Sequence, residues 1–219
     1  MRRWIASAAI LAAASISIAV FALQSPAEPL ATRVVAAAPQ ATVSPDRDSL
    51  TAAEADAAHR ANLLPANAKS LLKTSKPLRH GEFRWNDKDV PAGKLSIWVD
   101  LRRQMISVFR GGHEIGTSVI VYGADGMASP TGRFPILSKQ RDYHSRAYDA
   151  PMPYSLFITN GGVALHGSPV SSRHATHGCI GLPVEFARLL FDAAKTGDQV
   201  EVVSSDPVTV RQLTAAPQG

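Results

Sequence analysis

Short runs of alternating apolar residues dominate the chain from about Gly81 onward, and they constrain its fold more than any other feature. In the stretch KLSIWVD, the aliphatic residues Leu95, Ile97 and Val99 occupy every second position, which predicts a strand with two unlike faces. The runs QMISVFR and HEIGTSVIVYG follow closely, and Gly111-Gly112 lies between them. Such close spacing predicts antiparallel neighbours.

Further signals extend this pattern to residues 81–205. We predict strands in RFPILSKQ, YSLFITN, GVALHG and DQVEVVS, with a hairpin turn at Asn160-Gly161-Gly162 and an ordered loop in ADGMASPTG. The stretch LPVEFARLLFDAAKTG predicts a helix, since Pro183 suits a first helical turn and Gly197 an end. The expected fold is therefore mainly β, a β-sandwich or mixed sheet with one substantial helix after Cys179.

The first 27 residues predict export. Arg2 and Arg3 precede an uncharged run from Trp4 to Leu23, which is the layout of a secretory signal peptide. The run is also long enough to serve as an N-terminal membrane anchor, and the sequence leaves cleavage and retention open.

Residues 28–80 predict a flexible Ala/Pro-rich tether, because few large apolar side chains offset the entropy of ordering. Within it, SLTAAEADAAHRANLLP predicts a short helix, with Ser49 or Thr51 as the cap and Glu54 completing a capping box. A second helical patch is expected over residues 66–73. Residues 206–219 are expected to form a C-terminal tail.

Charge argues against nucleic-acid binding. The formal net charge is +5, but residues 79–219 carry fifteen Lys/Arg against thirteen Asp/Glu, so the β-rich part is nearly balanced. We find no concentrated basic stripe and expect no nucleic-acid partner.

The only cysteine, Cys179, lies in the stretch HGSPVSSRHATHGCIGLP. Gly178 and Gly181 leave the chain around it free to turn sharply and to point successive N–H groups at one spot, as a developing oxyanion requires. His166 ends a predicted strand thirteen residues earlier. A cysteine within reach of a histidine is the nucleophile and base pair of acyl-transfer enzymes.

Two other interpretations of these residues stay open. A lone cysteine is commonly a small buried apolar side chain. A zinc site could use His174, His177, Cys179 and His166, although the spacing is not that of common zinc fingers and no carboxylate lies within 166–184. We expect no metal and no cofactor.

The residues His166-Gly167 and Thr176-His177-Gly178-Cys179 resemble the signature of the L,D-transpeptidase catalytic domain (YkuD) family. The stretches SIWVDLRRQMISVFRGG and ASPTGRFPI resemble two more segments of that family, so the resemblance covers about 94–203. It implies an L,D-transpeptidase-like β fold with its site at one end of a sheet.

The resemblance also implies residue roles. Cys179 is then the nucleophile, His166 the base, and the Gly167 carbonyl the group that orients the imidazole. The N–H groups of His177, Gly178 and Cys179 form the oxyanion hole. Tyr154 and Thr176 are expected to contact substrate, although core packing is an equal alternative for Tyr154. Many members carry Arg or Asn two residues after the cysteine, where this chain has Gly181.

The function that the resemblance implies is peptidoglycan remodelling in the periplasm or cell envelope. With the predicted leader, we expect an exported enzyme, and we expect it to be a monomer. Cys179 attacks a stem tetrapeptide, D-Ala leaves, and an amine on a second stem resolves the thioester to a 3→3 cross-link that shapes the cell wall. Carbapenems can trap such a cysteine. An L,D-carboxypeptidase or cross-link hydrolase with the same site, and a non-catalytic wall-binding module, remain alternatives.

Overall fold

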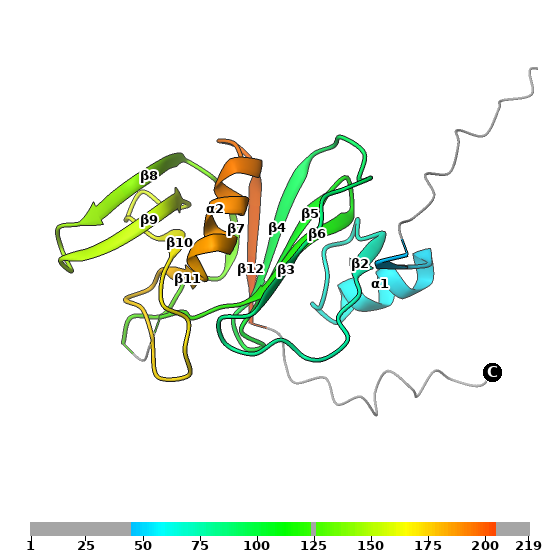
Figure 1. Ribbon diagram of the computed structural model, residues 1–219, viewed down its shortest axis with the longest axis horizontal. Helices are drawn as coiled ribbons and strands as arrows, with labels where there is room; N and C mark the ends of the chain where they lie inside the picture. Colours follow the sequence, from blue (N-terminus) through cyan, green and yellow to red (C-terminus); the bar gives the residue numbers. More distant parts are fainter. Residues whose placement is uncertain (1–44, 124–125, 205–219) are drawn as a thin grey trace, which may run out of the picture. The chain divides into compact units, whose positions relative to one another are not determined.

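A computed structural model of the chain describes residues 45–123 and 126–204, and these residues form two β-sheets and two helices (Figure 1). The larger sheet has eight strands in the order β1-β2-β6-β5-β4-β12-β7, with β3 paired to β6. These strands are β1 (Arg47–Ser49), β2 (Ser70–Leu72), β3 (Phe83–Trp85), β4 (Leu95–Asp100), β5 (Met105–Arg110), β6 (His113–Val119), β7 (Gly132–Pro135) and β12 (Gln199–Val203).

The smaller sheet has four strands in the order β11-β10-β9-β8. Its strands are β8 (Ser138–Ser145), β9 (Ala150–Phe157), β10 (Ala164–Gly167) and β11 (Ile180–Leu182), and helix α2 (Val184–Ala193) follows β11 directly. The predicted mainly β fold, with a substantial helix just after Cys179, is therefore confirmed.

The predicted alternation in the central strands separates two apolar clusters. Strand β4 is antiparallel to β5 and parallel to β12, and its aliphatic face, with Leu95, Ile97 and Val99, belongs to the main core. That core also takes in β10, β11 and the buried side of α2, so the helix is the element that joins both sheets. The opposite face of β4 and β5 places Trp98 and Phe109 in a second cluster.

The second cluster is closed by the N-terminal segment, which is not a tether from residue 45 onward. Leu50, Leu64, Ala68 and Leu71 pack against Trp98 and Phe109, and β2 pairs with β6. The prediction of a flexible 28–80 segment is thus wrong for 45–72. The predicted helical patch at 66–73 contains no helix, and Ser70–Leu72 within it form strand β2. Strands of three residues are too short to show an alternating pattern, which is why the sequence did not reveal them.

Helix α1 (Ala52–Arg60) confirms the predicted short helix. Thr51 is its N-cap, and a reciprocal capping box joins Thr51 and Glu54, as the sequence indicated. Neither α1, with 9 residues, nor α2, with 10, is long enough to cross a bilayer, and within the described part of the chain no helix is long and apolar enough to do so. The predicted leader at 1–27 and tail at 206–219 lie outside the described residues.

A buried arginine ties the N-terminal segment to the sheet. Arg47, in β1, is 5% exposed and donates to the backbone carbonyls of Glu114 in β6 and Asn86. The Glu114 side chain, also buried, accepts a hydrogen bond of 2.8 Å from the Leu72 amide. Burial raises the pKa of Glu114, and the nearby Arg47 charge partly opposes this. A buried guanidinium group needs hydrogen bonds in place of water, and for Arg47 two backbone carbonyls supply them.

One predicted strand is divided in two. The run RFPILSKQ supplies β7 and the start of β8, and the chain passes from one sheet to the other at Ile136 and Leu137. Just beyond this crossing, Lys139 donates to the carbonyls of Phe191 and Ala194 at the end of α2. A cation there satisfies carbonyls that have no partner within the helix.

We predict that Arg47→Ala lowers the free energy of unfolding by about 3 kcal/mol, because it leaves two backbone carbonyls, those of Glu114 and Asn86, without their charged donor. Urea denaturation of the full chain measures this. Lys73→Ala is the matched control, since the Lys73–Asp48 pair is 50% and 69% exposed and should change stability by less than about 1 kcal/mol. Equal effects of the two substitutions would contradict an integral role for residues 45–72.

Candidate active site

The parallel pairing of β10 with β11 brings His166 and Cys179 together. The register aligns Leu165 with Ile180 and His166 with Gly181, and Cys179 is the residue just before Ile180. Because side chains alternate along a strand, Cys179 lies on the same face of this sheet as His166. Both residues line one cavity, which we call the Cys179 cavity.

His166 is held in one orientation and tautomer. Its Nδ1 lies 2.9 Å from the Gly167 carbonyl oxygen, and since a carbonyl only accepts, Nδ1 carries the proton. The other ring nitrogen, Nε2, is then free to accept one. The side chain is 7% exposed, and burial lowers the pKa of His166, while the Gly167 carbonyl raises it and the charge of His174 lowers it. A neutral imidazole with a free Nε2 is the form that a general base requires.

Cys179 is half-buried, and its Sγ lies 3.9 Å from the Gly162 carbonyl oxygen. Burial raises the pKa of the Cys179 thiol, and a hydrogen bond with the backbone of Ala164 opposes this in part. The raised pKa of Cys179 and the lowered pKa of His166 both favour the uncharged forms of the two side chains. A thiol in this state needs its proton removed as it attacks.

The backbone around Cys179 is fixed by two hydroxyl groups. Thr176 Oγ1 and Ser129 Oγ both donate to the Cys179 carbonyl, the second over 3.4 Å, and Ser129 Oγ accepts from the Gly123 amide over 3.0 Å. Ser129 begins the Ser-Pro-Thr-Gly segment that the sequence singled out without giving it a task. Thr176, predicted to touch substrate, lines the Cys179 cavity while its hydroxyl holds this loop.

Gly178 gives the loop its turn, with a φ of 105° that favours glycine. The amides of His177, Gly178 and Cys179 have no hydrogen-bond acceptor among residues 45–123 and 126–204. Three successive free amides next to a sulfur are donors available to an anion. Their predicted role as an oxyanion hole remains a prediction.

The Cys179 cavity has a volume of about 350 Å³. The rings of Tyr148 and His177 stack at its wall, with centroids 4.2 Å apart and planes 8° from parallel. Tyr148 follows β8, and the sequence gave no signal for it. The lining residues are Ser145, Tyr148, Ala150, Pro151, Met152, His166, Ser168, Pro169, His174, Ala175, Thr176, His177 and Cys179, and none of these is Asp, Glu, Lys or Arg.

Tyr154 lies elsewhere. It is not among the residues that line the Cys179 cavity, and its ring packs edge-on against Phe191 of α2, with centroids 5.9 Å apart. The Arg141 guanidinium covers the same tyrosine ring at 5.4 Å. Of the two roles considered for Tyr154, this position favours core packing.

Gly181 has no space for a side chain. A Cβ at this position would lie 2.6 Å from Val121 Cγ2 and 3.0 Å from Ser168 Cβ. The crowding arises because Val121 and Gly181 form an antiparallel bridge, with N–H···O bonds of 3.0 and 2.8 Å. The departure from Arg or Asn at this position is therefore a packing requirement of this chain.

The described residues contain no cluster of side chains suited to a metal ion. No group of three or more His, Cys, Asp or Glu side chains in 45–123 and 126–204 is arranged to hold a metal ion. The four residues considered for zinc include His174, whose Nε2 instead lies 3.3 Å from Ser168 Oγ, and His177, which stacks on Tyr148.

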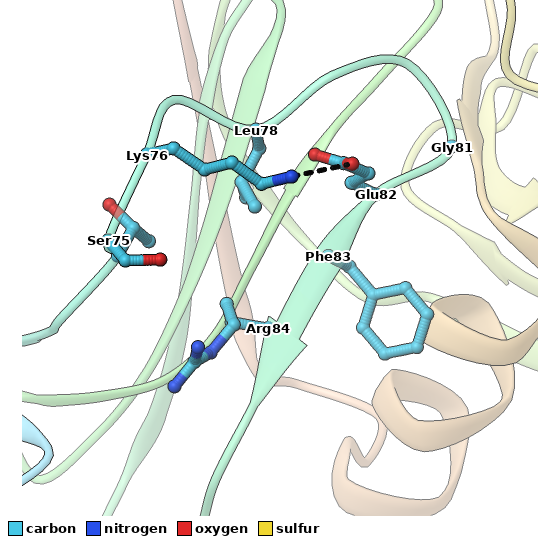
Figure 2. A pocket seen from close by; sticks show the side chains of 8 residues that line it. Ser75, Lys76, Leu78, Gly81, Glu82, Phe83 and Arg84 are labelled. Atoms are coloured by element: carbon cyan, nitrogen blue, oxygen red, sulfur yellow. Dashed lines mark ion pairs between the residues drawn. The ribbon is translucent and has the colours of Figure 1, made fainter.

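A second hollow, of about 360 Å³, lies beside β3 (Figure 2). An ion pair of 3.7 Å between Lys76 and Glu82 crosses it, and it is lined by Thr74, Ser75, Lys76, Leu78, Gly81, Glu82, Phe83 and Arg84. It holds no cysteine or histidine. The Cys179 cavity is therefore the better candidate for nucleophilic chemistry.

The residues that carry this cavity resemble a known family. Residues 94–202 match the family described as YkuD, the L,D-transpeptidase catalytic domain. L,D-transpeptidase 1 of Mycobacterium tuberculosis is 32% identical, over 44% of this chain and 45% of the relative, so the chain spans less than half of the curated relatives it matches.

Solved structures were matched as well. An L,D-transpeptidase from Stackebrandtia nassauensis is 26% identical, with a TM-score of 0.49 over 54% of this chain and 60% of that one. An L,D-transpeptidase mutant from Enterococcus faecium is 25% identical, with a TM-score of 0.46 over 51% of this chain and 50% of that one.

We predict that the alkylation rate of Cys179 rises with pH to a midpoint above the value of about 8.5 typical of free cysteine. Burial disfavours the thiolate, so the shift is upward. Intact-mass measurement of iodoacetamide labelling gives the rate, and the urea-unfolded chain, with its single cysteine, is the reference. A midpoint below that reference would mean that Cys179 and His166 rest as an ion pair.

We also predict that Gly181→Ala lowers the free energy of unfolding by about 2 kcal/mol, since the added Cβ overlaps a buried valine. The loss should be smaller in a Val121→Ala background, where the overlapping methyl is absent. A double-mutant cycle in urea measures the coupling. Additive effects would show that another contact excludes the side chain.

Proposed function

Residues 94–202 belong to the L,D-transpeptidase catalytic domain family, and on this basis we propose that the chain is a cysteine acyltransferase that remodels peptidoglycan. The observation that carries the proposal is the arrangement of the Cys179 cavity. It combines a half-buried thiol, an imidazole fixed through its Nδ1, and three amides that have no acceptor within the described part of the chain. The substrate class, the stem peptides of peptidoglycan, is carried over from the family.

In the first half-reaction, His166 Nε2 takes the proton of Cys179 Sγ as the sulfur attacks the carbonyl of the third stem residue. The new S–C bond forms a tetrahedral intermediate, and its oxygen carries the negative charge. When the C–N bond to D-Ala breaks, the His166 imidazolium returns its proton to the leaving amine. The product is a thioester on Cys179 and free D-Ala.

The amides of His177, Gly178 and Cys179 are assigned to the oxyanion. Preorganised backbone donors of this kind lower the barrier because they need no reorientation as charge develops. The hydroxyls of Thr176 and Ser129 support the assignment, since they hold the Cys179 carbonyl and thereby the direction in which the loop amides point.

In the second half-reaction, an amine on another stem attacks the thioester. His166 Nε2 now removes a proton from the amine, the new C–N bond forms, and the S–C bond breaks to restore the thiol. The cycle is a ping-pong reaction with two tetrahedral intermediates. Its product is a 3→3 cross-link, or a related stem exchange if the amine belongs to another acceptor.

The proposed place of action is the cell envelope. Peptidoglycan is extracytoplasmic, and the positively charged, apolar leader predicted at residues 1–27 would bring the chain there.

We predict that a carbapenem forms a covalent adduct at Cys179, with a mass increase in the intact protein that Cys179→Ala abolishes. His166→Gln should slow adduct formation by at least about 100-fold, because the base is lost. Circular dichroism of each variant confirms folding. Wild-type protein that is folded but gains no adduct would count against the proposal.

Product analysis with isolated tetrapeptide stems separates the acceptors. Cross-linked dimers support transpeptidation, and tripeptide with free D-Ala would instead identify a carboxypeptidase with the same nucleophile. A wall-binding module predicts neither product, and it predicts that Cys179→Ala binds cell-wall sacculi as well as wild type does.

A further inference from the structure

The Cys179 cavity has an unusual charge composition for a site that receives an anion. The donor stem of the proposed function ends in D-Ala, whose carboxylate lies one residue from the bond that breaks. Among the residues that line the cavity, only His166, His174 and His177 can carry a positive charge. A carboxylate brought into a partly enclosed cavity needs a compensating charge or donor.

Geometry distinguishes the three histidines. His166 uses Nδ1 on the Gly167 carbonyl and must keep Nε2 free for the proton of Cys179. The His177 ring lies flat against Tyr148. His174 is fixed at one nitrogen only, with Nε2 3.3 Å from Ser168 Oγ, and its Nδ1 has no partner among the described residues.

Ser168, the hydrogen-bond partner of His174, is held by the β-sheet. Ser168 is buried, follows Gly167 directly, and continues the β10–β11 pairing through its amide, which donates to the Leu182 carbonyl over 2.8 Å. The His174 amide donates to Ser171 over 3.1 Å, so the short turn between them is also closed. His174 is exposed enough to meet a ligand and yet is anchored to the strand that carries His166.

We propose that His174 is a specificity-determining residue that binds the terminal carboxylate of the donor stem. The inference rests on the proposed function and deepens it. The ligand class is an acyl donor whose leaving group is an amino acid with a free carboxylate.

Other ionisable groups surround this position. They are His166 on β10, Arg173, His177 and Cys179 on the same loop, Arg146, Tyr148 and Asp149 between β8 and β9, and Arg79 and His80 beside Gly81, which lies next to Val170. Arg146 and Arg173 are exposed and make no ion pair with any residue of 45–123 or 126–204. Exposed charges of this kind act on approach and are screened by salt, whereas His174 acts by contact.

The test compares two donors, a tetrapeptide stem with a free terminal carboxylate and the same stem with a terminal amide. Thioester formation or D-Ala release is measured from about pH 5.5 to pH 8.5, the range in which histidine loses its proton. For wild type at low pH, we expect the KM of the carboxylate donor to be about tenfold lower than the KM of the amide donor, as for a charge-assisted hydrogen bond. At high pH we expect the two KM values to become similar.

His174→Gln can still bond Ser168 but cannot become charged. It should lose the preference at every pH, with the change in KM rather than in kcat. His144→Gln, an exposed histidine in β8, is the matched control and should keep the wild-type preference. Ser168→Ala, which removes the anchor only, should reduce the preference in part and provides a second variant should His174→Gln fail to fold.

The outcomes are distinguishable. If wild type is acylated by neither donor, the proposed function fails. If wild type is acylated and His174→Gln or Ser168→Ala keeps the full, pH-dependent preference, the role of His174 is overturned while the proposed function stands.

Discussion

The short parallel pairing of β10 and β11 is the constraint on which the site depends. It aligns His166 with Gly181 and thereby sets Cys179 on the face that His166 occupies. The residues that follow His166 continue this arrangement. The Gly167 carbonyl holds the His166 imidazole, and the Ser168 amide donates to the Leu182 carbonyl and extends the pairing. Because α2 follows β11 at once and packs into the main core, the strand that follows Cys179 is held by both the sheet and the helix.

The sequence predicted the elements that have long, regular patterns. The central strands, the hairpin at residues 160–162 and helix α2 follow from periodicity and turn residues, because each places several side chains in one environment. The family resemblance singled out His166 and Cys179 as candidate base and nucleophile, and the two residues line one cavity. Ser129, Tyr148 and Ser168 were given no role, because their tasks arise from loops that meet only in the folded chain.

Residues 45–72 show where composition misleads. An Ala-rich, weakly apolar stretch suggests a tether, yet a few leucines suffice when a large apolar surface already exists on the sheet. The buried Arg47 adds a specific attachment that no periodicity reveals. Gly181 is a similar case, since only the bridge to Val121 explains why a side chain is excluded.

The position of β12 has a consequence for biosynthesis. This strand, from the last described segment of the chain, lies between β4 and β7 within the larger sheet. Until the ribosome has made Gln199–Val203, β4 has an open edge and the sheet lacks an interior member. Contacts of such long sequence separation form slowly. Strand β7 pairs with β12 in this sheet, so it can join the sheet only once the later strand exists.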